Sequence, residues 1–169
     1  MSQALADRVR EIPDVSFGVV TSAWPLAPWA DFLAAQDIAW WRKNPTALTE
    51  FSGAKYSANR IDGVIRVQSS CMTSSTNSGV LALEVARIRG ATRIILLGFD
   101  QHGSHYFGPY TNGLTNTPEP RRASHRHQFR MWGLMHKHVE VLNATKGSAL
   151  TCFPTIDLDA LDSHLALAG

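Results

Sequence analysis

NSGVLALEVARIRGATRIILLGFD, residues 77–100, is the stretch of sequence that decides the fold. Leu81, Val85 and Ile88 recur at helical spacing, and Gly90 follows where helices commonly end. The run TRIILLGFD is then almost wholly apolar, which is typical of a parallel strand covered on both faces. A helix followed directly by a buried strand predicts an α/β fold.

The segments on either side continue the alternation of helices and strands. Toward the N-terminus we expect a helix over 3–11, a strand over 15–22, a helix over about 27–36 and a strand over 37–41. Two short strands follow at 54–60 and 63–70, with Asp62 and Gly63 in a turn between them. Toward the C-terminus we expect a loop over 101–121, a helix over 125–138, a strand over 139–145 and a terminal helix that opens at Asp157. The helix over 125–138 is predicted to bury Phe129, Trp132 and Met135. This order predicts a mostly parallel sheet flanked by helices, in a single domain spanning 1–169.

Composition excludes several classes of protein. The chain has 169 residues, 44% of them hydrophobic, which is enough for a core. The formal charge of +2 disfavours a nucleic-acid partner, and Cys71 and Cys152 lack the spacing of a disulfide framework or a zinc site. No apolar run is long enough to span a membrane, so we expect a cytoplasmic protein without a membrane partner.

The candidate site lies where the strand at 92–100 ends, because ligands of parallel sheets collect beyond the carboxyl ends of the strands. Asp100 ends that strand, and the loop behind it supplies further polar side chains: His102, Ser104, His105 and Tyr106. The helix before the strand begins with Thr76, Asn77, Ser78 and Gly79, whose hydroxyl, amide and backbone donors could hold a phosphate or a ribose hydroxyl. We expect both groups to face one crevice.

Simpler readings of the same residues stay open. Thr76 to Gly79 could serve only as an N-cap, Asp100 could cap its own turn, and the histidines could be ordinary loop residues. Asp100, His102 and His105 could instead ligate a metal, but no further ligand has a matching spacing, so we assign neither a metal nor a cofactor. The signatures GxSxG, HExxH, the P-loop and GxGxxG are absent.

Residues 77–100 resemble the small-residue helix and GFD-ending strand of a widespread set of phage and prophage proteins of unassigned function. The resemblance continues through APWAD at 27–31, Trp40 and Trp41, HYFG at 105–108, and NATKGSALTCFP at 143–154. Those proteins resemble, in turn, the Rossmann-like domain of the 6-hydroxymethylpterin diphosphokinase-like family and of the sialyltransferase-type glycosyltransferases. The resemblance implies a Rossmann-like fold and a place in the cytoplasm of a bacterial host cell.

For activity, the resemblance implies that Ser78 and Gly79 lie by the nucleotide of a CMP-sugar and that His105 lies near the reacting groups. An imidazole there acts as general acid or base near neutral pH. The chain lacks the first strand and glycine-serine turn of the phage relatives, and the later His/Glu motif of sialyltransferases. We therefore expect either a start that lies upstream or a lost donor loop.

Two functions follow as hypotheses. The first is a phage-type protein that binds a nucleotide or nucleotide-sugar and transfers its group to an acceptor, with His105 as acid or base and Asp100 holding a hydroxyl. The second is a non-catalytic nucleotide-binding or protein-interaction module with a role in phage assembly or counter-defence. The tryptophans Trp24, Trp29, Trp40 and Trp41 fit core packing or an interface better than a platform for base stacking. A homo-oligomer formed through exposed tryptophans such as Trp24 or Trp40 is left open.

Overall fold

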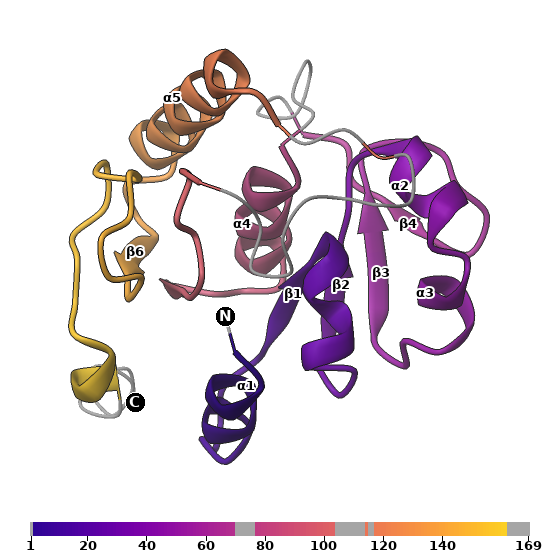
Figure 1. Cartoon of the computed structure of the whole chain (residues 1–169), viewed down its shortest axis with the longest axis horizontal. Coiled ribbons are helices and arrows are strands. Elements are labelled where there is room, and N and C mark those ends of the chain that lie inside the picture. The colour runs from indigo at the N-terminus through magenta and orange to yellow at the C-terminus, as the bar shows by residue number, and fades with distance from the viewer. Residues whose placement is uncertain (1, 70–76, 104–113, 115–116, 162–169) are drawn as a thin grey trace. The chain divides into compact units, whose positions relative to one another are not determined.

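The computed structural model describes residues 2–69, 77–103, 114 and 117–161, and every strand pair among them is parallel (Figure 1). The chain divides into two compact units. The amino-terminal unit comprises Ser2–Arg89 and Thr111–Leu114, and the carboxyl-terminal unit comprises Met1, Gly90–Tyr110 and Thr115–Gly169. The α/β class with a parallel sheet is confirmed, whereas a single domain spanning 1–169 stays a prediction.

The amino-terminal unit is built on a four-stranded parallel sheet in the order β1-β2-β3-β4. Its strands are β1 (Gly18–Val20), β2 (Phe32–Ala34), β3 (Ala54–Ser57) and β4 (Ile65–Arg66). Its helices are α1 (Gln3–Arg10), the 3-10 helix η1 (Thr21–Leu26), α2 (Ile38–Lys43), α3 (Thr46–Thr49) and α4 (Ser78–Ile88). The strands predicted at 54–60 and 63–70 are therefore confirmed as β3 and β4, and they run parallel.

Helices flank both faces of this sheet. Leu33 of β2 shares one buried cluster with Trp41 of α2 and Ala47 of α3. Because side chains alternate along a strand, Phe32 points to the opposite face. There the guanidinium of Arg89, which caps α4, lies 5.7 Å from the Phe32 ring centroid, and α4 contacts β1 and β2. This arrangement is that of a Rossmann-like α/β fold.

The helix predicted over 27–36 is wrong. Phe32, Leu33 and Ala34 form β2, and all three are buried. Strand β2 pairs with β1 on one side and β3 on the other, so its backbone groups are satisfied by the sheet. Pairing on both sides outweighs the helical spacing of Trp29, Phe32 and Leu33.

The strand predicted over 37–41 is wrong as well, because residues 38–43 form α2. The Asp37 carboxylate caps this helix by accepting a hydrogen bond from the Ala39 N–H at 2.7 Å. The Trp40 and Trp41 side chains are buried, with ring centroids 5.0 Å apart in an edge-to-face contact. Of the two roles that the sequence leaves open for these two tryptophans, core packing and an interface, the structure shows core packing.

The carboxyl-terminal unit contains β5 (Arg93–Leu96), α5 (Glu119–Met135), β6 (Glu140–Asn143) and the 3-10 helix η3 (Leu158–Ala160). Strands β5 and β6 pair in parallel, as the sequence predicts. Only Leu96 of β5 is buried, whereas Arg93, Ile94 and Ile95 are partly exposed. The expected cover on both faces of this strand is therefore incomplete, and among the described residues β5 has one hydrogen-bonded neighbour, β6.

Helix α5 packs through aromatic side chains. Phe129 and Trp132 are buried as predicted, and the Phe129 ring meets those of Phe99 and Phe153 edge-to-face. The predicted burial of Met135 is wrong, since this residue is 49% exposed. The physical reason is that His136 follows the helical spacing from Trp132 and packs against it, with ring centroids 4.7 Å apart.

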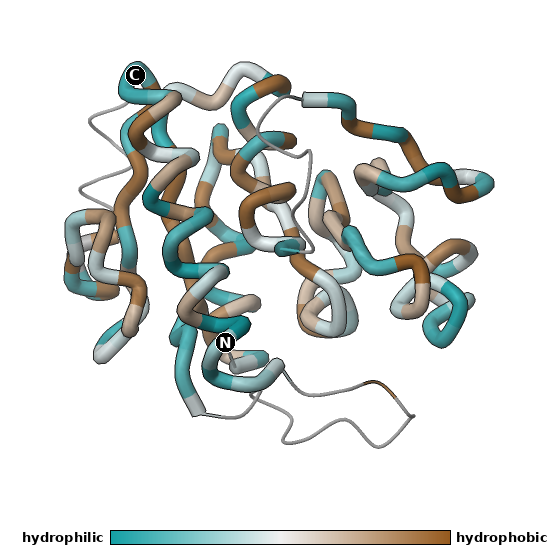
Figure 2. Tube along the Cα trace, turned by 90° about the horizontal axis from the view of Figure 1, so that it is seen from above, coloured by the Kyte–Doolittle hydropathy of each residue, from teal (hydrophilic) through white to brown (hydrophobic). Residues whose placement is uncertain are grey.

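Apolar residues are dispersed along the described trace, and in Figure 2 the brown stretches are interrupted by white and teal ones. Each helix in residues 2–69, 77–103 and 117–161 is too short or too polar to cross a lipid bilayer.

Candidate functional site

Asn77 is the N-cap residue of α4. Its Oδ1 accepts hydrogen bonds from the backbone N–H groups of Gly79 and Val80, at 3.0 and 3.4 Å, and its side chain is buried. An N-cap of this kind satisfies amides that the helix leaves unpaired. In this structure Asn77 therefore does what the simpler reading of this segment predicts, and Thr76 lies outside the described residues.

Ser78 connects α4 to the carboxyl end of β2. The backbone N–H of Gln36 donates to Ser78 Oγ at 3.0 Å, across 42 positions of sequence. Gln36 lies two residues beyond the last residue of β2, at the edge of the sheet where its strands end. The bond brings the first turn of the helix to that edge, as expected for the ligand side of a parallel sheet.

Gln36 is the centre of a polar cluster, formed with Ser57, Asn59 and Ser78. Its backbone carbonyl accepts hydrogen bonds from Asn59 Nδ2 at 2.6 Å and from Ser57 Oγ at 3.4 Å. The Asn59 N–H donates in turn to Ser57 Oγ at 3.2 Å. The carboxyl ends of β2 and β3 and the start of α4 are thereby joined by neutral amide and hydroxyl groups.

Gln36 itself is buried, with 6% of the residue exposed. Its carboxamide oxygen Oε1 is buried and has no hydrogen-bond partner among the residues that the structure describes. Buried polar atoms are nearly always paired in folded proteins, so each unpaired one calls for an explanation. Gln36 and Asn59 are not among the site residues predicted from the sequence, because a glutamine after a short apolar run carries no motif.

The carboxyl end of β1 holds a strained residue. Thr21, which follows β1 directly, has φ of 45°. This left-handed conformation is unfavourable for a β-branched residue, and such strain is found disproportionately at functional sites. The next residue, Ser22, accepts a hydrogen bond from Trp40 Nε1 at 3.0 Å, which connects η1 to α2.

In the carboxyl-terminal unit, the loop after β5 is fixed through its backbone. Thr145 Oγ1 accepts from the Phe99 N–H at 3.0 Å, and Ser148 Oγ donates to the Phe99 carbonyl at 2.6 Å. The Asp100 carbonyl accepts from the Ala149 N–H at 2.8 Å. The loop after β6 therefore fixes the backbone of Asp100. The residue itself is partly exposed.

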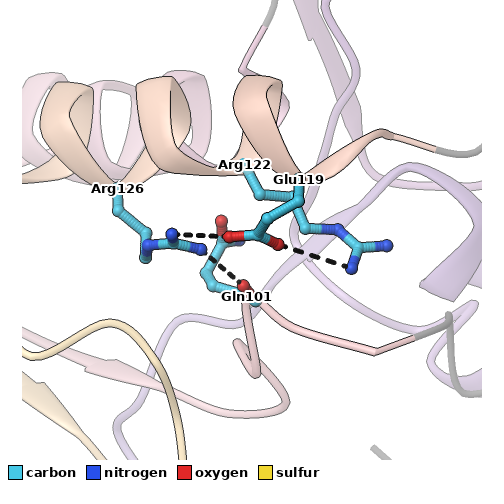
Figure 3. A network of polar contacts seen from close by, with 4 residues as sticks. All are labelled: Gln101, Glu119, Arg122 and Arg126. Atoms are coloured by element: carbon cyan, nitrogen blue, oxygen red, sulfur yellow. Dashed lines mark hydrogen bonds and ion pairs between the residues drawn. The ribbon is translucent and has the colours of Figure 1, made fainter.

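Residues 101 and 102 are held by two further contacts. Arg126 donates one hydrogen bond to the Gln101 carbonyl at 3.0 Å and another to Glu119 Oε1 at 2.7 Å (Figure 3). The Gln101 backbone has a φ of 57°. His102 is exposed, and its Nε2 lies 3.0 Å from the Gly147 carbonyl oxygen.

Glu119 is the acidic member of this network, and its other oxygen lies 4.0 Å from Arg122 Nη1. The hydrogen bond from Arg126 lowers the pKa of Glu119 from its usual value, and the charges of Arg126, Arg122 and His102 act in the same direction. Partial desolvation opposes this shift. The carboxylate thus stays ionised at neutral pH and balances the arginines at the start of α5.

The predicted site residues belong partly to each of the two units, and some of them lie outside the described residues. Ser104, His105 and Tyr106 lie outside the described residues. Asn77, Ser78 and Gly79 belong to the amino-terminal unit, whereas Asp100 and His102 belong to the carboxyl-terminal unit. The two groups thus belong to different units, and a crevice shared by them stays a prediction.

Metal binding has no support from the described residues, in which no three His, Cys, Asp or Glu side chains gather closely enough to hold an ion. Asp100 and His102 are among the described residues, whereas His105 lies outside them. Metal binding by these three residues together therefore stays a hypothesis.

Comparison of the chain with protein-family models, with curated proteins and with solved structures found no match. The resemblance to phage proteins and to sialyltransferase-type enzymes stays a prediction.

Proposed function

We propose that the carboxyl edge of the β1-β2-β3-β4 sheet binds a nucleotide or a nucleotide-sugar. The observation that carries the proposal is the hydrogen bond from the Gln36 N–H to Ser78 Oγ. It brings the start of α4 to the end of β2, which is where parallel α/β sheets bind nucleotides. The positive end of the helix dipole favours a phosphate there.

The chemistry of the cluster supports this class of ligand. Asn59 and Ser78 are neutral and partly exposed, and their amide and hydroxyl groups suit the hydroxyls of a ribose and the polar edge of a base. Asn77 already pairs two amides of α4, so backbone donors for the phosphate are fewer than in a glycine-rich phosphate loop. Nucleoside contacts therefore carry more of the binding in this proposal than phosphate contacts do.

Group transfer from the nucleotide-sugar to an acceptor hydroxyl is the activity that we propose for the chain. His105 would take the proton of the attacking hydroxyl as general base, and Asp100 would hold a hydroxyl in place. The acceptor oxygen forms a bond to the sugar carbon as the sugar-phosphate bond breaks, and the nucleotide leaves with the bonding electron pair. Support comes from the sequence resemblance and from the backbone anchoring of Asp100.

Thermal unfolding in the presence of CMP-, UDP- and GDP-sugars tests the binding. A ligand at about 100 times its dissociation constant adds about 2.7 kcal/mol to the free energy of unfolding. For a chain of this length we expect the melting temperature to rise by about 5–10 °C with at least one donor. Inorganic phosphate and the free sugar are the controls, and no shift with any of the three donors would overturn the proposal.

A further inference from the structure

Gln36 combines two features that separate it from the other glutamines of the described chain. The residue is 6% exposed, and its Oε1 has no hydrogen-bond partner among the described residues. Gln101 also has a buried, unpaired Oε1, but this residue is partly exposed. Gln36 alone places such an oxygen within a polar cluster at the carboxyl edge of a parallel sheet.

The fold itself does not need the carboxamide. Each hydrogen bond that the structure gives to Gln36 uses its main chain: the N–H donates to Ser78, and the carbonyl accepts from Asn59 and Ser57. An apolar side chain at this position would keep all three bonds. It would also remove the desolvation cost of an unpaired buried acceptor, so stability alone would favour the apolar residue.

Resting on the proposed function, we infer that Gln36 is a binding residue whose Oε1 accepts a hydrogen bond from the nucleoside part of the ligand. A carboxamide oxygen is an acceptor only, so the ligand must present an N–H or an O–H group. A base amino group and a ribose hydroxyl both satisfy this requirement. An inorganic anion without a proton does not.

The Oε1 atom of Gln36 would also discriminate between nucleosides. A site built to pair with a donor rejects an analogue that lacks the donor, because the buried acceptor is then left unpaired. Cytosine presents an exocyclic amino group where uracil presents a carbonyl oxygen. If Oε1 accepts from the base amino group, CMP binds more tightly than UMP. If it accepts from a ribose hydroxyl, CMP binds more tightly than the deoxy analogue that lacks that hydroxyl.

Replacement of Gln36 with methionine tests the inference, because methionine has a similar length and volume and no oxygen. We expect Q36M to raise the melting temperature of the ligand-free protein by about 2–6 °C. We expect it to weaken CMP binding by about 10- to 100-fold in calorimetric titrations. Gaining stability and losing affinity together is the signature of a residue kept for binding.

The control is Q3M, which makes the same replacement at an exposed glutamine of α1 that donates to Asp7 and to the Leu26 carbonyl. It should leave CMP affinity unchanged and should not raise the melting temperature. Titrations with UMP, 2′-deoxy-CMP and 3′-deoxy-CMP identify the ligand group that donates to Oε1. Q36M should abolish the preference for CMP over the one analogue that lacks this donor group.

Two failures are distinguishable. If the wild-type protein binds no nucleotide, the proposed function is overturned and the nucleoside contact of Gln36 with it. If the wild-type protein and Q36M bind CMP equally, or if Q36M lowers the melting temperature, the role of Gln36 is overturned while the proposed function stands.

Discussion

Replacing Trp41 with alanine is expected to lower the free energy of unfolding by about 3–5 kcal/mol. Trp41 is among the largest fully buried side chains of the described chain. Its indole fills space between α2 and the sheet, and its Nε1 donates to the Ala35 carbonyl at 2.8 Å. The alanine variant loses the apolar contacts, leaves a cavity and leaves the Ala35 carbonyl oxygen without its side-chain donor. Denaturation with urea, followed by circular dichroism, measures the change.

Two variants make this result interpretable. I38A changes an exposed residue on the same helix and should shift the free energy of unfolding by no more than about 0.5 kcal/mol. W41F keeps a ring without the indole N–H, so its loss should fall between those of I38A and W41A. A loss in W41A no larger than that in I38A would show that the α2 packing described above is wrong. Since Ala35 precedes Gln36, W41A should also weaken nucleotide binding.

Replacing His105 with alanine is expected to lower turnover by about 10²- to 10⁴-fold if the protein is a transferase, because that is the usual contribution of a general acid or base. Nucleotide release from the donor that raises the melting temperature measures the rate. Binding of that donor should change little, since His105 acts on the acceptor proton. The residue lies outside the described part of the chain, so this expectation rests on its sequence context.

The control for His105 is H127A, which changes an exposed histidine of α5 and should leave both turnover and binding unaltered. An enzyme loses turnover in H105A and keeps its ligand. A non-catalytic module shows no turnover in the wild-type protein, and H105A then changes affinity or nothing. Equal turnover in H105A and in the wild-type protein would exclude His105 as the acid or base.

The sequence predicted best those elements whose signal is local and periodic. Helix α4 has a continuous apolar stripe and an N-cap, so it forms close to where its pattern indicates. Strands β5 and β6 are apolar runs and were also found. Strand β2 is three residues long and α2 is six, and runs this short do not distinguish a helix from a strand. Their structures are decided by pairing and packing with distant residues.

The candidate site shows the same limit. Asn77 and Ser78 were selected because small polar residues precede a helix, and that signal is local. The sequence does not predict Gln36 as a site residue, because the cluster it belongs to is formed by contacts with Ser78, 42 residues away, and with Asn59, 23 residues away. Contacts over such separations leave no pattern in a single sequence. A polar residue directly after an apolar strand is the one weak signal that was available.

The most direct test of the central claim is a titration of isotope-labelled protein with CMP, followed by amide resonances in nuclear magnetic resonance spectra. The account predicts the largest shifts at the backbone amides of Gln36 and Ser78 and at the side-chain amides of Gln36 and Asn59. Shifts confined to other parts of the chain, or none at saturating CMP, would contradict it.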